Sequence, residues 1–181
     1  MTTFKLQAGD RFPGLEVSGD DGVRDLSKPL GTSDWMMVVV YRGRHCPMCT
    51  RYLNRLEGFV AELAEVGVDV AAVSADSRAQ LARHREKLDV TFPLFHGLSV
   101  AQMKELGLYI SDPRSPQETD HPFSEPGLFV INEHGTLQVV DISNNPFVRP
   151  ALATLVSGLR WIRDPQNDYP IRGTHPYANQ R

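Results

Sequence analysis

Two cysteines, Cys46 and Cys49, are the residues of this sequence whose types and spacing most directly indicate chemistry, and they are the only cysteines in the 181-residue chain. A disulfide between residues so close in sequence closes a very small loop and removes little chain entropy, so it would stabilise the fold only slightly. In a reducing compartment, a Cys-x-x-Cys pair is typical of a redox-active dithiol or of a metal site.

The residues around the pair predict a junction between a strand and a helix. Residues 35–41 form an apolar run of strand length, which is typical of a strand buried on both faces. From Cys49 to Val66, apolar residues recur at spacings of three and four, which predicts a helix that begins near Pro47 and stops at Gly67. Residues three apart on a helix are neighbours, so the pair is expected to cycle between dithiol and disulfide.

Cys46 is placed where the unpaired N–H groups and the positive dipole end of the helix favour a thiolate. Arg42, Arg44 and His45 add positive or potentially positive charge nearby in sequence. Together these features are expected to lower the pKa of the Cys46 thiol below its ordinary value of about 8.5. We therefore expect Cys46, at the more exposed edge of the helix start, to attack and Cys49 to resolve, with Arg42 and Arg44 stabilising the thiolate.

Two other interpretations of the cysteine pair remain open. The two residues are also compatible with a pair of buried cysteines that happen to be close. A metal site needs about four ligands, and no second Cys/His pair at metal spacing is present, although His45 beside Cys46 would suit a copper-like site. No cofactor and no resident metal are predicted.

The remaining pattern predicts an α/β fold with a central mixed sheet flanked by helices and an N-terminal hairpin extension. Strand–helix–strand units pair in parallel and a hairpin adds antiparallel pairing. The first hairpin turns at residues 18–22, and residues 112–126 form a loop. Further strands are expected at residues 68–73, 127–131 and 137–142, and further helices at about residues 77–88, 99–106 and 150–162.

Length and composition favour one ordinary domain, over residues 1–163, followed by an extended polar tail at residues 164–181. The formal net charge of -3 gives no general attraction to nucleic acid or to an anionic membrane surface. No apolar run reaches the length of a membrane span, and the first residues lack an apolar secretory core. A reducing, cytoplasmic setting is therefore expected.

Several motifs together resemble a peroxiredoxin-like protein of the alkyl hydroperoxide reductase and thiol-specific antioxidant superfamily, over roughly residues 6–162. The motifs lie at residues 6–13, 38–49, 73–77, 92–94 and 126–131. This resemblance implies a thioredoxin-like fold. By the same likeness, Pro126 is similar to the cis-proline that faces the active cysteine in thioredoxin-like proteins.

The resemblance also implies a thiol-dependent peroxidase that reduces hydroperoxides. A cysteine thiolate would become a sulfenic acid, a second cysteine would condense with it, and an outside dithiol would reduce the disulfide. The expected partners are a hydroperoxide substrate and a thioredoxin- or glutaredoxin-like electron donor. Peroxiredoxins often dimerise, so a homodimer is a further expectation.

The sequence departs from the family pattern at three places. Typical peroxiredoxins carry a Pro and a Thr or Ser seven and three residues before the attacking cysteine. Val39 and Gly43 stand there if Cys46 attacks, and Arg42 and Cys46 if Cys49 attacks. Pro126 replaces the arginine that precedes the late strand. Two alternatives to the peroxidase therefore stay open: a thiol–disulfide oxidoreductase that acts on protein disulfides, and a non-catalytic redox sensor or metal-binding protein.

Overall fold

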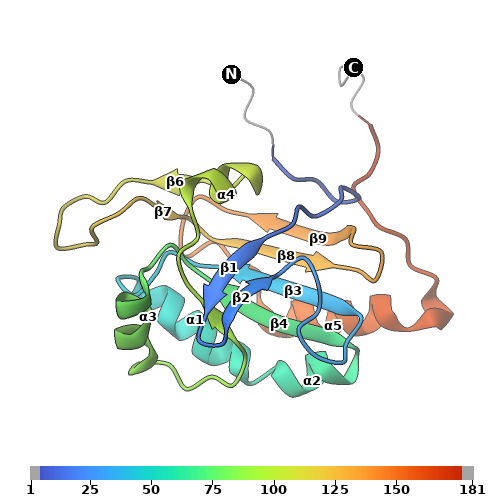
Figure 1. Cartoon of the computed structure of the whole chain (residues 1–181). Coiled ribbons are helices and arrows are strands. Elements are labelled where there is room, and N and C mark those ends of the chain that lie inside the picture. The colour runs from blue at the N-terminus through green and yellow to red at the C-terminus, as the bar shows by residue number, and fades with distance from the viewer. Residues whose placement is uncertain (1–4, 177–181) are drawn as a thin grey trace.

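The computed structural model of the chain describes residues 5–176 and contains a central five-stranded mixed sheet (Figure 1). The strand order is β5-β4-β3-β8-β9, in which β3 is parallel to β4 and antiparallel to β8. The strands span β3 Trp35–Val40, β4 Val68–Val73, β5 Leu94–Phe95, β8 Gly127–Ile131 and β9 Leu137–Ile142. The predicted thioredoxin-like α/β fold is confirmed.

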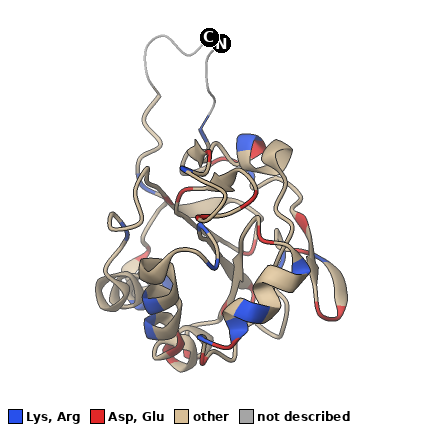
Figure 2. Cartoon of the chain, turned by 90° about the vertical axis from the view of Figure 1, so that its left-hand side faces the viewer, with Lys and Arg blue, Asp and Glu red and all other residues tan. Residues whose placement is uncertain are grey.

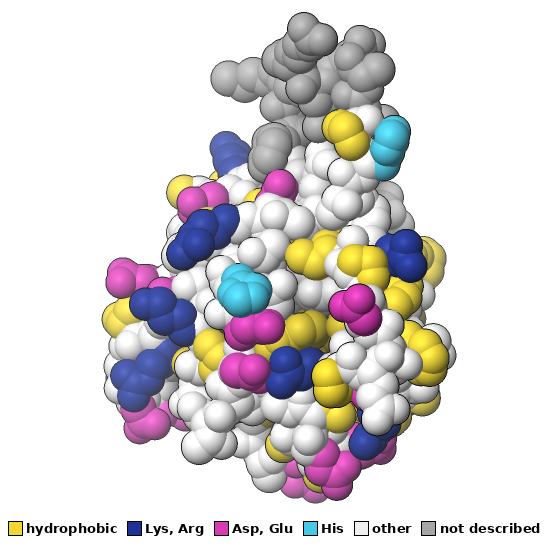
Figure 3. Space-filling view, turned by 90° about the vertical axis from the view of Figure 1, so that its right-hand side faces the viewer, with side chains coloured by type: hydrophobic (Ala, Val, Ile, Leu, Met, Phe, Trp, Pro, Cys, Tyr) yellow, Lys and Arg dark blue, Asp and Glu magenta, His cyan; other side chains and the backbone are white. Residues whose placement is uncertain are grey.

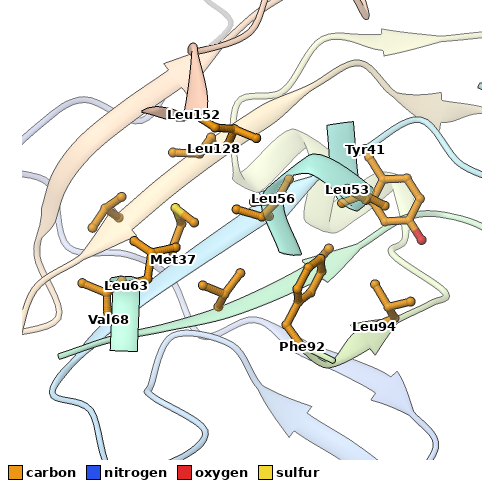
Figure 4. Close-up of a cluster of buried hydrophobic side chains, with 14 of the residues drawn as sticks. Met37, Tyr41, Leu53, Leu56, Leu63, Val68, Phe92, Leu94, Leu128 and Leu152 are labelled. Carbon is orange, nitrogen blue, oxygen red and sulfur yellow. The ribbon is translucent and has the colours of Figure 1, made fainter. Parts of the chain in front are cut away.

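The middle strand β3 is buried along its whole length because both faces of the sheet are covered. Its side chains alternate between two clusters of buried apolar residues. Figure 4 shows the first cluster, in which Tyr41 lies beside Leu53 and Met37 lies near Leu63. The second cluster takes Val38 and lies on the opposite face of the sheet.

Helices cover both faces, but unequally. The cluster with Met37 includes side chains from α1 Pro47–Glu57, α2 Val60–Glu65, α3 Arg78–Arg85 and α5 Leu152–Arg163. The opposite cluster holds Met103 of α4 Val100–Glu105, together with the N-terminal segment and the first hairpin. Ser77 is the N-cap of α3 and Ser99 is the N-cap of α4. The side-chain oxygen of each serine accepts a hydrogen bond from the backbone N–H of the residue three positions later.

The helix expected from Pro47 to Gly67 is wrong as one continuous element, because it breaks at Gly58 and Phe59. The N–H of Gly58 donates to the carbonyl of Arg55 and that of Phe59 to Leu56, so the turn tightens to three-residue hydrogen bonds. Glycine is a poor helix former, which explains why the break occurs there. The break allows α2 to change direction and pack against β4.

Two small sheets stand outside the central one. The predicted N-terminal hairpin is present as β1 Glu16–Gly19 and β2 Gly22–Asp25, with only Asp20 and Asp21 in the turn. The loop expected at residues 112–126 contains the strand β7 Phe123–Ser124, which pairs with β6 Ile110–Ser111. The segment between β6 and β7 projects as a finger in Figure 1.

The chain beyond α5 forms a short helical turn, η1 Pro165–Asn167, and then runs mostly exposed through residue 176. Figure 2 shows basic residues on several helices at one end of the molecule, and Figure 3 shows charges of both signs mixed with apolar side chains at the other. Within residues 5–176, no helix is long and apolar enough to cross a membrane.

Candidate active site

The cysteine pair lies at the predicted junction between β3 and α1. Cys46 is the N-cap of α1, and its sulfur accepts a hydrogen bond from the backbone N–H of Cys49 over 3.2 Å. Pro47 occupies the first helical turn, where its missing N–H costs nothing. The two cysteines form a disulfide, with their Cα atoms 5.3 Å apart. The expected pairing of these residues is therefore present in the structure.

The expectation that Cys46 is the more exposed cysteine is wrong. Cys46 is 1% exposed and Cys49 is 0% exposed, so the two residues are buried alike. Both belong to the apolar cluster that holds Leu53 and Leu56, because the sulfur atoms face the core side of the first helical turn. Exposure therefore gives no ground for ranking one cysteine above the other as the attacking thiol.

Gly43 allows the chain to reach the helix start. Its φ of +133° lies in a region that favours glycine, and a Cβ at this position would lie 2.6 Å from Asp76 Oδ1. The buried Asp76 carboxylate accepts a hydrogen bond of 2.7 Å from the backbone N–H of Arg44. This hydrogen bond fixes the loop that leads to Cys46. Burial of the Asp76 carboxyl raises its pKa.

The charge of Arg42, expected to stabilise the thiolate, is instead directed at two glutamates. Arg42 Nε lies 3.3 Å from Glu125 Oε2, and Arg42 Nη2 lies 3.7 Å from Glu118 Oε1. Its guanidinium also stacks over the Phe123 ring, 4.7 Å from the ring centre. Arg44 is half-buried, and within residues 5–176 neither Arg42 nor Arg44 donates a hydrogen bond to a cysteine sulfur.

His45 is a neutral neighbour of Cys46. Burial lowers the pKa of His45 to about 4, and the charge of Arg42 adds to this effect. The ring packs edge-on against Phe123, with 4.5 Å between ring centres. No group of three or more His, Cys, Asp or Glu side chains able to hold a metal ion occurs among residues 5–176.

Arg149 is a site residue that the sequence pattern did not predict. Its Nη2 donates a hydrogen bond of 2.8 Å to the sulfur of Cys49. The guanidinium lies over the Tyr52 ring, 4.9 Å from its centre, and the Tyr52 hydroxyl donates to the carbonyl of Pro150. Burial lowers the pKa of Arg149 to about 10, which leaves it charged at neutral pH. Arg149 is 100 residues from Cys49, and no local motif marks it as a sulfur ligand.

Pro126 lies beside the site but does not have the expected cis conformation. None of the peptide bonds that the structure describes is cis, so the bond before Pro126 is trans. The Pro126 carbonyl accepts the N–H of Ser143, which extends the pairing of β8 and β9 up to this residue and keeps the chain extended. Pro126 lines a small cavity with Tyr52 and Arg149, the arginine that contacts Cys49.

A buried histidine of α3 contacts the first turn of α1. His84 of α3 is 0% exposed, and its Nε2 lies 2.9 Å from the hydroxyl of Thr50. That hydroxyl also donates to the carbonyl of Cys46 over 3.3 Å. Burial lowers the pKa of His84 to about 4, so the ring is neutral at physiological pH. The contact ties α3 to the first turn of α1.

Comparison with protein families gives one match over most of the chain. The model of the AhpC/TSA family matches residues 8–140, which include both cysteines and the whole of β3. No curated protein matches the sequence.

Solved structures with the same fold include redox proteins of different kinds. A cysteine-to-serine mutant of peroxiredoxin 6 from Arenicola marina aligns with a TM-score of 0.73 and 19% identity, over 87% of this chain and 74% of that one. The peroxidoxin BcpB from Mycobacterium tuberculosis aligns with a TM-score of 0.69 and 22% identity, over 86% and 97%. A putative thiol:disulfide interchange protein DsbE from Chlorobium tepidum aligns with a TM-score of 0.65 and 17% identity, over 88% and 99%. At these identities the likeness concerns the fold.

Proposed function

The chain belongs to the AhpC/TSA family, and we propose that it is a thiol-dependent peroxidase that reduces hydroperoxides with Cys46 and Cys49. The observation that carries this proposal is the guanidinium of Arg149 on the sulfur of Cys49. A cation at 2.8 Å in a buried site lowers the pKa of a thiol strongly, and the same cation stabilises the negative charge that develops on the leaving oxygen of a peroxide.

Cys49 is the attacking cysteine in this proposal, which reverses the roles expected from the sequence. Both thiols lie in the first turn of α1, and Cys46 accepts only a neutral N–H from the helix. A direct guanidinium contact favours a thiolate more than a helix terminus does, since the helix dipole contributes about 0.3–1 kcal/mol whereas an opposite charge shifts a pKa by about 1–3 units. The negative charge of the reduced pair therefore resides on Cys49.

The peroxidase step is a nucleophilic displacement at oxygen. The Cys49 thiolate attacks the terminal oxygen of the hydroperoxide, the S–O bond forms, and the O–O bond breaks. The alkoxide leaves and takes up a proton to become an alcohol, or water when the substrate is hydrogen peroxide. Cys49 becomes a sulfenic acid. Arg149 acts in this step because it contacts the reacting sulfur and faces the charge that moves to the leaving group.

Cys46 resolves the intermediate. Its thiolate attacks the sulfenic sulfur of Cys49, the S–S bond forms, the S–O bond breaks, and the departing hydroxide takes up a proton to leave as water. The Cα separation of 5.3 Å lies within the range that disulfides span, so no change in fold is needed. An outside dithiol of the thioredoxin or glutaredoxin type then returns two electrons by thiol–disulfide exchange.

Exchange with protein disulfides is the second candidate function. The Cys-Pro-Met-Cys sequence at a helix start favours it, as does the fold shared with a putative thiol:disulfide interchange protein. The burial of both cysteines argues against it, because a bulky protein disulfide must reach a sulfur that a small peroxide reaches more easily.

The experiment that tests the proposal is single-turnover oxidation of two variants by hydrogen peroxide, with the sulfenic acid trapped by dimedone and located by mass spectrometry. We expect Cys46→Ser to form a sulfenic acid at Cys49, and Cys49→Ser to react at least about 100-fold more slowly. Fast oxidation of Cys49→Ser at Cys46 would restore the roles expected from the sequence.

Steady-state assays separate the two functions. Reduction of hydrogen peroxide and of an organic hydroperoxide is measured with thioredoxin and with glutaredoxin as donors, and insulin reduction is measured on the same sample. Peroxide turnover that requires Cys49 supports the peroxidase. Insulin reduction without peroxide turnover assigns the protein to disulfide exchange.

A further inference from the structure

We infer that a groove beside the cysteine pair binds hydroperoxides that carry a carboxylate and a long hydrocarbon chain, and that Arg51 and Arg55 bind the carboxylate. The inference deepens the proposed peroxidase and rests on it. The groove lies between α1 and the segment that leads into α5, and its volume is about 370 Å³. Cavities of about 300–1,000 Å³ are typical for organic ligands of this size.

The lining of the groove suits a hydrocarbon chain. Met48, Phe59 and Leu152 contribute apolar surface, and the Tyr52 ring forms part of the wall. Phe147 stands at the edge with 67% of its surface exposed, which is unusual for a large aromatic side chain. Burying such surface against an alkyl chain is favourable by roughly 25 cal/mol per Å².

The charge of the lining suits an anion. Arg51, Arg55 and Arg149 line the groove, and no acidic residue does. Arg51 and Arg55 are exposed and four residues apart on α1, so they stand on the same face of the helix. Within residues 5–176, neither of them forms an ion pair with a carboxylate of this chain. Two free guanidinium groups in this arrangement favour a carboxylate of the ligand.

Arg149 connects the groove to the reactive sulfur. Arg149 belongs both to its lining and to the contact with Cys49, and Met48 lies next to Cys49 in the chain. Arg55 lies six positions after Cys49 along α1, which is about 9 Å of helix rise. A ligand whose carboxylate and hydroperoxide are separated by several methylene groups therefore spans from the free arginines to Arg149.

Hydrogen peroxide needs neither the apolar wall nor Arg51 and Arg55, and a neutral hydroperoxide uses only the apolar wall. An acidic segment of a protein donor would meet the same arginines, but the concave apolar floor argues for a hydrocarbon chain. Comparing one ligand with and without its negative charge measures the contribution of the two arginines alone.

The test compares the 9-hydroperoxide of linoleic acid with its methyl ester, below their aggregation concentrations. We expect wild-type kcat/KM to be about tenfold higher for the acid, since two exposed ion pairs together contribute about 1–2 kcal/mol. In the double variant Arg51→Gln/Arg55→Gln, this ratio should fall to about one. The control Arg78→Gln/Arg83→Gln removes the same charge from the exposed face of α3 and should keep the wild-type ratio.

A direct binding measurement accompanies the kinetics, with laurate as a ligand that cannot react. Isothermal titration calorimetry should give at least fivefold weaker binding to the Arg51→Gln/Arg55→Gln protein than to the wild type and the control. Equal laurate binding by all three proteins, or equal kcat/KM for acid and ester in the wild type, would overturn the inference.

The same data separate failure of the inference from failure of the proposed function. If no hydroperoxide is turned over while laurate binding still depends on Arg51 and Arg55, the peroxidase is wrong and the groove remains an anion-binding hydrocarbon site. If hydrogen peroxide is turned over but the acid and the ester react equally, the peroxidase stands and the groove specificity is wrong.

Discussion

Arg42 lies four residues before Cys46 and Arg149 contacts Cys49, and these two arginines differ in what neutralises them. Arg42 lies within 4 Å of both Glu118 and Glu125, so its positive charge is matched by two negative ones. Arg149 has no carboxylate within that distance in the described part of the chain, and it donates to the sulfur of Cys49. An arginine close to a cysteine in sequence is therefore less informative than an arginine whose charge is free.

This difference gives the two arginines different roles. Arg42 holds β7 and the residues that flank it against the loop that leads to Cys46, through its ion pairs with Glu118 and Glu125 and its stacking on Phe123. Arg149 supplies a cation, not paired with a carboxylate, that stabilises the thiolate of Cys49. Removal of Arg149 should therefore affect chemistry, and removal of Arg42 should affect stability.

The largest expected effect is on catalysis by Arg149→Met. Loss of the cation at Cys49 should lower kcat/KM for hydrogen peroxide about 100-fold or more, as loss of a charge-stabilising donor does in other enzymes. The measurement is steady-state peroxide reduction at a saturating concentration of the electron donor. Arg149→Lys, which keeps a positive charge, should recover part of the activity.

Arg42→Met is the comparison variant for that experiment. It removes the same charge from an arginine that is paired with carboxylates and should lower kcat/KM less than about fivefold. If Arg42→Met and Arg149→Met lose activity equally, the assignment of different roles to the two arginines is wrong.

The second expected effect is on stability. Arg42→Met leaves Glu125 buried without its cation and should lower the free energy of unfolding by about 2–4 kcal/mol. Chemical denaturation monitored by circular dichroism measures this change. Adding Glu125→Gln to Arg42→Met removes the uncompensated charge and should recover about half of the loss. A destabilisation that Glu125→Gln does not reduce would show that the ion pair is not its cause.

The smallest expected effect concerns pH, and it arises from the neutral histidine behind the first turn of α1. Burial lowers the pKa of His84 from 6.5 to about 4, so the unfolded chain takes up a proton that the folded chain does not. The stability that this group contributes is complete above pH 6.5 and is lost as the pH falls towards 4. When the pH is lowered from 7 to 4, the free energy of unfolding should fall by about 1–3 kcal/mol less in His84→Gln than in the wild type. Parallel pH profiles for the two proteins would contradict this assignment.

The sequence predicts the scaffold better than it predicts the site. The apolar run of β3 and the helix pattern that follows Pro47 position both cysteines correctly, because the periodicity of burial is a local property. The break at Gly58 and the short strands β6 and β7 were missed, since elements of two residues carry no periodic signal. Their formation depends on packing between distant segments.

The electrostatics of the site were beyond local sequence reasoning. Arg42 follows β3 and is near Cys46 in sequence, but Glu118 and Glu125 come back to it from more than 70 residues away. Arg149 approaches Cys49 across 100 residues. The exposure expected for Cys46 failed for the same reason, because side chains that are distant in sequence pack around the helix start.

The thiol pKa of Cys49, measured from its rate of alkylation against pH, shows whether Arg149 makes Cys49 the attacking thiol. In the Cys46→Ser background, only Cys49 reacts, so one titration gives one pKa. We predict a value below about 8.5 that rises by at least about one unit when Arg149→Met is added and changes little when Arg42→Met is added. A Cys49 pKa at or above about 8.5 that does not respond to Arg149→Met, with a lower pKa for Cys46 in the Cys49→Ser protein, would assign the attack to Cys46.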